Sequence, residues 1–373
     1  MKRYRLTVLC SVIFCILMIA FPSLCVEGSK QALFLWGQTV VPALLPFFIC
    51  ANFMIATGVP NILGRFLEPL IKRIFCVPGE AAFAFVMSIT SGYPMGAKIV
   101  ADLRSNHVFT RAQAERTITF ACTSGPLFML GAVGAGMLLS PKAGWVIALS
   151  HYTGAIINGL FYGRLIREDG KSLSDRSRNT VPMKQNTMEI LNHAILDSVK
   201  SLIMIGGFML IFLIGITFFK AAGLFDYPLF HGFLEMTIGC SEVAALKGIS
   251  IGTVCMMCTA IISWGGLSVQ AQSLSFLSKT DIRPWVYFMS RATHMIFAAA
   301  ATVPFSYLFL EEVTETWVGN AGDLVASGSL FIYDLLFSSG MVIMTISVFF
   351  ILSIISAVLN DEKKRQEEKE TNE

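Results

Sequence analysis

The chain of 373 residues is strongly apolar, with 54% hydrophobic and only 14% charged residues, whereas soluble domains carry about 25% charged residues. This composition is typical of a polytopic membrane protein, and the small net charge of +3 gives no support to nucleic-acid binding. No Walker motif, HExxH motif or Gly-rich dinucleotide turn is present, so ATP-driven pumping and soluble catalysis are disfavoured. We therefore expect no enzyme activity, no catalytic residue and no cofactor.

The cysteine and histidine pattern gives no support to a metal site. The nine cysteines lie almost wholly in apolar runs, where free Cys behaves as a small hydrophobic residue. Cys255 and Cys258 have CxxC spacing, but no second Cys or His pair lies nearby in the sequence. His151, His193 and His294 have no partners at ligand spacing, and we interpret them as packed or interfacial residues.

Charge-free runs predict the membrane segments, since about 20 residues cross the hydrocarbon core. In chain order the runs are 6–26, 31–64, 81–97, 117–141, 143–163, 201–219, 248–278, 292–310 and 335–360. The run 81–97 is short and contains the Tyr93-Pro94 break, while 224–246 carries three acidic residues and is broken near Gly239. We interpret both as re-entrant hairpins. The expected fold is therefore an all-α polytopic membrane protein with about eight transmembrane spans and two re-entrant hairpins.

The first run, 6–26, has two interpretations. Lys2, Arg3 and Arg5 precede it, as basic residues do in a signal peptide. Its uncharged length, however, exceeds the usual signal core of about 7–15 residues. We therefore favour an uncleaved first span.

The charge distribution predicts which loops face the cytoplasm. With both termini in the cytoplasm, the loops near Arg65 and at 98–116, 164–200 and 279–291 are cytoplasmic as well. This topology places 24 of the 28 Lys and Arg residues inside, in agreement with the positive-inside rule. The basic residues left outside are Lys30, Lys142, Lys220 and Lys247.

Under this topology the order of elements repeats with reversed orientation. A span, a hairpin, a broken span and a further span follow one another in each half of the chain, which is a recurring plan of secondary transporters. The predicted organisation is a first span at 1–30, a first repeat at 31–165, a cytoplasmic linker at 166–190, an inverted second repeat at 191–310, an outer loop and last span at 311–360, and a charged cytoplasmic tail at 361–373.

Gly and Pro residues break the apolar segments in four places, at 91–94, 124–126, 237–239 and 263–266. A bilayer supplies no hydrogen-bond partners, so backbone freed by such breaks is tolerated only where protein or an internal polar cavity satisfies it. Paired breaks in the two halves of a chain point to a transporter's substrate site. The predicted solute site consists of Ser91, Gly92, Tyr93, Pro94, Lys98, Thr123, Ser124, Gly125, Glu235, Thr237, Gly239, Trp264, Gly265, Gly266 and Gln270.

The residue types at the predicted site indicate different roles in solute binding and coupling. The first break directs free N–H groups and the positive end of a helix dipole toward the gap, which favours an anion. Lys98 either adds positive charge there or extends to the cytoplasmic face. Glu235 either binds a coupling proton or cation, or holds the hairpin by accepting backbone N–H bonds. Gln270 and Gln272 cannot share one helix face, so at most one of them faces the solute.

The motifs SGYPMGAK, CTSGPLFMLGAVGAGM, LEMTIG and SWGGLSVQAQ together resemble the YlbJ-type sporulation integral membrane proteins of endospore-forming bacteria, within the nucleoside-recognition or Gate-domain group. The resemblance implies a multi-pass protein of the outer forespore membrane that moves dipicolinate, a small anionic solute, during sporulation. It implies the lipid bilayer and other sporulation membrane proteins as partners and leaves the oligomeric state open. Two other functions stay under consideration: transport of a nucleoside or another small solute, and a non-transporting scaffold for assembly of the spore cortex and envelope.

Overall fold

The computed structural model describes residues 2–167 and 187–310. The regular secondary structure of the described residues is entirely helical, with no β-strand among them. Most of the predicted linker, together with the predicted outer loop, last span and charged tail, lies outside the described residues.

The helices of the first half follow the predicted breaks closely. They are α1 (Lys2–Ala20), α2 (Pro22–Leu35), the π-helical segment η1 (Trp36–Val40), α3 (Val41–Ala56), α4 (Val59–Phe75), α5 (Ala81–Ser91), α6 (Met95–Ser105), α7 (Arg111–Phe120), the π-helical segment η2 (Leu127–Met137) and α8 (Pro141–Leu165). Thus α5 and α6 form the first predicted hairpin, and α7 and η2 form the first broken span.

The second half has the same order as α3, α5, α6, α7, η2 and α8, and α4 has no counterpart in it. It contains α9 (Thr187–Ala221), α10 (Pro228–Leu234), α11 (Met236–Ala244), α12 (Ile251–Trp264), α13 (Gly266–Leu277) and α14 (Pro284–Phe309). Corresponding elements make corresponding contacts, because α6 packs against α13 as α11 packs against η2. The last helices of the two halves, α8 and α14, pack against each other, as do α3 and α9.

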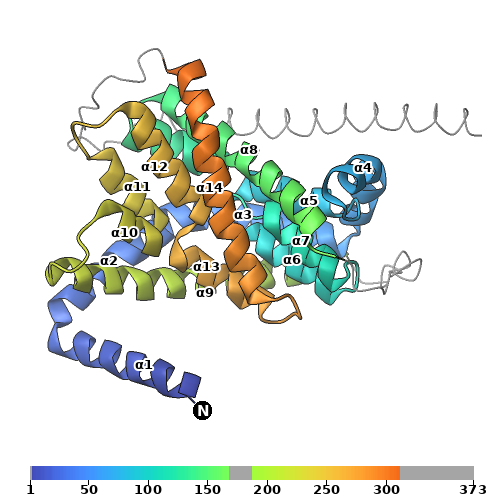
Figure 1. Cartoon of the computed structure of the whole chain (residues 1–373). Helices are drawn as coiled ribbons and strands as arrows, with labels where there is room; N and C mark the ends of the chain where they lie inside the picture. The colour runs from blue at the N-terminus through green and yellow to red at the C-terminus, as the bar shows by residue number, and fades with distance from the viewer. Residues whose placement is uncertain (1, 168–186, 311–373) are drawn as a thin grey trace, which may run out of the picture.

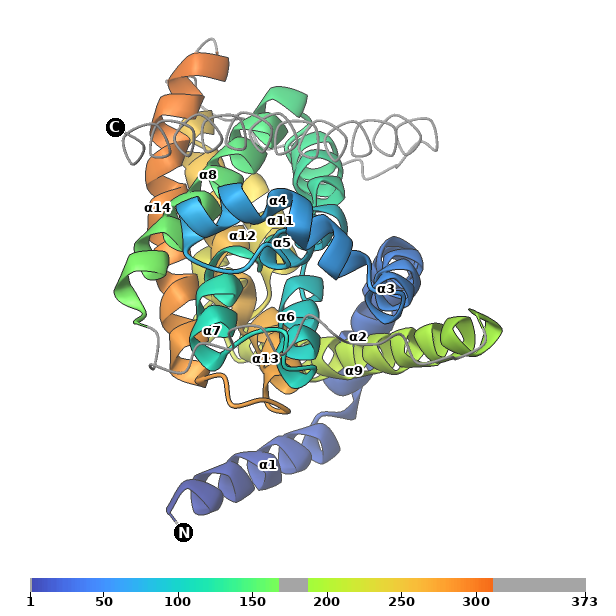
Figure 2. The same ribbon diagram turned by 90° about the vertical axis from the view of Figure 1, so that its right-hand side faces the viewer.

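In both ribbon views α9 runs across the base of the bundle at a steep angle to α14 (Figure 1, Figure 2). By length and composition, three described helical segments could cross a membrane: Thr187–Ala221, Ile251–Leu277, which comprises α12 and α13, and Pro284–Phe309. A fourth is added if the bent pair Ser11–Ala20 and Pro22–Gln38 counts as one span. The number of eight spans and the reversed orientation of the second half stay predictions.

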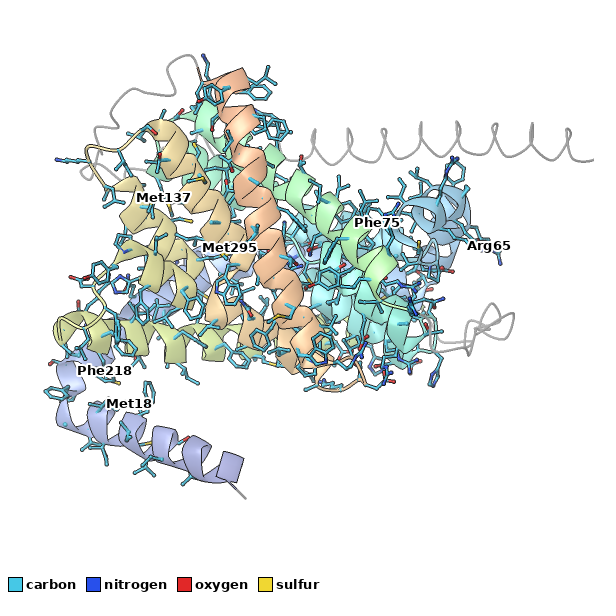
Figure 3. All side chains as sticks on the ribbon, viewed as in Figure 1. Met18, Arg65, Phe75, Met137, Phe218 and Met295 are labelled. Carbon is cyan, nitrogen blue, oxygen red and sulfur yellow. The ribbon has the colours of Figure 1, made fainter. Side chains whose placement is uncertain are left out.

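The first predicted span is bent by 106° between Ala20 and Pro22, where proline removes a backbone donor, and its crossing of the membrane stays a prediction. Two expectations about element boundaries are wrong. The loop expected near Arg65 is the amphipathic helix α4, which buries Leu67 and Ile71 while Arg65 points outward at the edge of the molecule (Figure 3). The loop expected at 279–291 ends early, since α14 already begins at Pro284.

Two apolar cores support the breaks. In the first, the Phe75 and Phe120 rings stack with centroids 4.1 Å apart, and Phe85 meets Phe120 edge to face at 5.5 Å. These rings join α4, α5 and α7 and fix the first hairpin beside the first broken span. The second core lies between η2, α8, α11 and α12 and does the same for the second hairpin.

Candidate functional site

The first two breaks contact each other directly. Gly92 follows the end of α5 with φ 77° and ψ −169°, a conformation that essentially only glycine adopts. A Cβ at Gly92 would lie 2.8 Å from the Gly125 nitrogen, so the two backbones approach too closely for a side chain. In the same region the Thr123 N–H donates to Ser88 Oγ at 2.9 Å. The residues predicted in these two breaks therefore form one structural unit.

The third and fourth breaks also meet, although the third lies earlier than expected. Glu235 is the only non-helical residue between α10 and α11, and the predicted break at 237–239 lies within α11. That placement is wrong because Glu235 Oε2 accepts a 2.8 Å bond from the Ile238 N–H and thereby starts the helix sooner. A Cβ at Gly266 would lie 3.0 Å from the Leu234 carbonyl oxygen, so the fourth break packs on the third.

Trp264 holds the second hairpin against the fourth break. Its Nε1–H donates to the Phe233 carbonyl at 3.1 Å, and the two rings stack with centroids 5.1 Å apart. Gly265 follows with φ 84° and separates α12 from α13. The indole ring predicted to contact solute therefore already stacks on an aromatic residue of the same half.

Three contacts connect the breaks of the first half to the fourth break. The Tyr93 hydroxyl donates to the Ile262 carbonyl at 3.3 Å. His151 of α8 accepts from the Ser124 N–H through Nε2 at 2.9 Å, and its Nδ1 lies 2.9 Å from Ser263 Oγ. All four breaks thus converge, and we call residues 91–94, 121–126, 235 and 263–266 the break junction.

Hydrogen bonding at the break junction fixes the protons of two buried histidines. His151 Nε2 receives an N–H bond, so its proton is on Nδ1, which donates to Ser263 Oγ. His294 Nε2 lies 2.9 Å from the His151 carbonyl, which can only accept, so Nε2 carries the proton. Its Nδ1 then accepts from Arg291 Nη1 at 3.3 Å. Both imidazole rings are neutral in this arrangement.

Arg291 lies deep in the bundle, beside the second break. Sequence reasoning placed it at the end of a cytoplasmic loop, but the structure buries it fully inside α14. Its Nη1 donates to the Cys122 carbonyl, and its Nη2 donates to the Thr119 carbonyl at 2.9 Å. Nη1 also lies 3.4 Å from the Tyr93 hydroxyl. These bonds satisfy carbonyl groups that the end of α7 leaves free.

Lys98 lies at a separate cavity of about 970 Å³ between α3, α6, α9 and α13. Its Nζ donates to Asn52 Oδ1 at 2.6 Å and to Asp102 Oδ2 at 2.9 Å. The other polar residues that line the cavity include His193, Asp197, Lys200, Ser201 and Lys279. The lysine charge is therefore presented to this cavity and shared with a carboxylate.

Several buried polar atoms have no hydrogen-bond partner among the described residues, and those at or beside the break junction include Ser91 Oγ, Gln270 Oε1 and Arg291 Nε. Buried polar atoms are normally paired. The amide nitrogen of Gln270 donates to the Trp264 carbonyl at 3.1 Å, whereas that of Gln272 donates to Ser268 Oγ at 3.3 Å. The unpaired atoms make Ser91, Gln270 and Arg291 the strongest candidates for direct contact with a solute.

The structure brings most of the predicted site residues together. Thr237 and Gly239 lie within α11, and Lys98 faces the cavity. Sequence reasoning left Ser88 and Arg291 out of the site and interpreted His151 and His294 as packed or interfacial residues. The structure buries both histidines, and His151 bonds to Ser124 and Ser263 of the break junction. A charged residue next to the apolar run 292–310 was the signal that could have revealed Arg291. Across residues 2–167 and 187–310, no three His, Cys, Asp or Glu side chains gather as a metal site would require.

Comparison with known proteins identifies a family model and a relative that this chain resembles. Residues 38–140 match the Gate family, described as nucleoside recognition. The chain is 32% identical over 318 residues to the sporulation integral membrane protein YlbJ of Bacillus subtilis (strain 168), covering 75% of this chain and 77% of that protein. No solved structure matches the chain.

Proposed function

Because this chain belongs to the family of the sporulation integral membrane protein YlbJ, we propose that it transports dipicolinic acid across the outer forespore membrane during sporulation. The observation that carries the proposal is the convergence of four helix breaks, two from each half, at one buried polar junction. Non-helical backbone at membrane depth is a recurring feature of transporter substrate sites.

The recurring order of elements supports an inverted repeat as the framework of this transporter. Equivalent hairpins, broken helices and long helices make equivalent contacts in the two halves. In our proposal the halves have opposite orientations in the membrane, both termini are cytoplasmic, and the chain crosses the membrane about eight times. The cavity at Lys98 then opens toward the cytoplasm, and the break junction lies between it and the other side.

Dipicolinate suits the chemistry of the break junction. It is a flat aromatic dianion, so the ring of Tyr93 offers a stacking surface and the first break offers the positive end of the α6 dipole. Ser91 and Gln270 offer unpaired polar atoms. These groups bind a planar solute that carries hydrogen-bonding groups and negative charge.

A nucleoside is the second candidate solute, because the family model that matches residues 38–140 is described as nucleoside recognition. Competition distinguishes the two. Uptake of labelled dipicolinate into vesicles that contain the protein should be blocked by excess unlabelled dipicolinate and unaffected by uridine. Inhibition by uridine together with weak dipicolinate uptake would favour the nucleoside.

Lys98 provides a charge test of the proposed pathway. Lys98→Ala should weaken uptake of dipicolinate severalfold at low concentration, because a buried cation at the cavity is lost. The fold should persist, since the remaining partner Asp102 is partly exposed to solvent. Initial uptake rates over a range of dipicolinate concentrations measure the effect. Lys30→Ala, which removes an exposed lysine of α2, is the control, and equal uptake by both variants would assign Lys98 a purely structural role.

A further inference from the structure

Arg291 places a positive charge in the interior of the bundle, and residues 2–167 and 187–310 provide no counter-charge for it. Its side chain is fully buried, and it takes part in none of the ion pairs that the described residues form. Its hydrogen-bond partners are two backbone carbonyls, the Tyr93 hydroxyl and a neutral His294. A buried charge is costly unless an opposite charge compensates it, and an ionisable residue inside a membrane helix generally marks a functional site.

One edge of the Arg291 guanidinium group is only partly used. Nη1 and Nη2 donate to carbonyls at the end of α7, but Nε has no acceptor among the described residues. A guanidinium group offers N–H donors on all three nitrogens, and adjacent donors match the two oxygens of a carboxylate. The edge formed by Nε and Nη2 therefore retains capacity for an anion.

Two other arginines show how this chain binds carboxylates. Arg104 donates from Nε and Nη2 to the two oxygens of Asp281 at 2.8 and 2.9 Å. Arg283 uses the same two nitrogens to bind Glu115. The bonds from Arg104 hold the pKa of Asp281, in the loop after α13, below its usual value. Both arginines thus pair with a carboxylate through the edge at which Arg291 has an unpaired Nε.

We propose that Arg291 binds a carboxylate group of the transported solute through Nε and Nη2, and so supplies the counter-charge that selects anions. This inference rests on the proposed transport function and names the solute class as carboxylates. The ring of Tyr287 lies against the guanidinium group, with 5.6 Å between Cζ and the ring centroid. That contact limits the approach to the edge of the group and favours planar, bidentate binding.

Anion binding at Arg291 requires movement of the breaks. The guanidinium group is fully enclosed, and its covering residues belong to the first and second breaks, through Tyr93 and Cys122. A carboxylate reaches it when these breaks separate from α14. When the solute leaves, the bonds from Arg291 to Tyr93 and Cys122 form again. Arg291 thus both binds the anion and closes the break junction.

Calorimetry on the full-length protein in detergent tests the inference with two probes, dipicolinate and its neutral diamide. Arg291→Lys keeps the charge but loses the paired donors, so its affinity for dipicolinate should fall at least about tenfold. Arg291→Gln should lose more, and affinity for the diamide should be unchanged in both variants. Arg104→Lys is the matched control, because Arg104 already has its carboxylate; its affinity for dipicolinate should equal that of the wild type.

Different results would contradict the role of Arg291 and the transport of dipicolinate. Unchanged dipicolinate affinity in Arg291→Lys would overturn the role of Arg291 while leaving dipicolinate transport standing. Binding of uridine but not of dipicolinate by the wild type would overturn both proposals. If the Arg291 variants do not fold, thermal unfolding of the wild type decides, because dipicolinate should raise the midpoint more than the diamide does. Equal shifts would overturn anion selection.

Discussion

Gly96→Ala is expected to leave little folded protein, with a loss of stability of more than about 4 kcal/mol. A Cβ built on Gly96 of α6 lies only 1.5 Å from the Ala121 carbonyl oxygen and 2.9 Å from Ser88 Oγ. The first of these atoms belongs to the backbone of the second break, which cannot yield without moving that break. Thermal unfolding in detergent, with the amount of monodisperse protein, measures the loss.

Gly207→Ala is the matched control for this substitution. Gly207 is an exposed glycine within α9, and no atom lies within 4 Å of the position of its Cβ. Alanine there should be neutral or stabilise the protein by up to about 1 kcal/mol, because it favours the helix. Near-normal stability of Gly96→Ala would show that α6 does not pack against the second break as described.

Glu235→Gln is expected to abolish proton-driven accumulation of solute while retaining exchange or downhill flux. Glu235 is buried, and its carboxylate oxygen caps α11 by accepting the Ile238 N–H. A glutamine oxygen accepts the same bond, so the fold should persist, but the side chain no longer binds and releases a proton. Accumulation driven by an imposed pH gradient, and exchange measured without the gradient, separate the two modes of transport.

Glu235→Ala distinguishes the cap from the proton site. Losing the cap should cost about 1 kcal/mol of stability, and both transport modes should fall together with the amount of folded protein. Normal accumulation by Glu235→Gln would eliminate Glu235 as an obligatory proton carrier. Glu242, which pairs with His231 at 2.6 Å and with Lys220, or a facilitator without proton coupling would then remain.

The breaks were predictable because their signals are local. Gly and Pro within apolar runs are visible in the sequence, and α5 ends at Ser91 as its motif indicates. The difference at the third break also has a local cause. A glycine in an apolar run predicts a helix break at 237–239, but Gly239 packs closely on Gly232 inside the second hairpin.

The residues that connect the two halves could not be predicted in this way. His151 bonds to Ser263 across 112 positions of the chain, and Arg291 bonds to Cys122 across 169. Neither pair has a spacing rule, because three-dimensional packing alone brings the residues together. Arg291 also directly precedes the apolar run 292–310, and a charge at the end of such a run normally indicates a loop. Its burial depends on carbonyl groups that the second break releases.

Dipicolinate transport requires that the protein alone moves this solute across a membrane. Purified protein should be reconstituted into lipid vesicles without any other protein, and uptake of labelled dipicolinate should be compared with that of protein-free vesicles of the same lipid. The account predicts uptake that saturates with dipicolinate concentration and scales with the amount of protein. Protein that is shown to be folded by its thermal transition and still gives no uptake above the protein-free level would contradict the account and favour the scaffold.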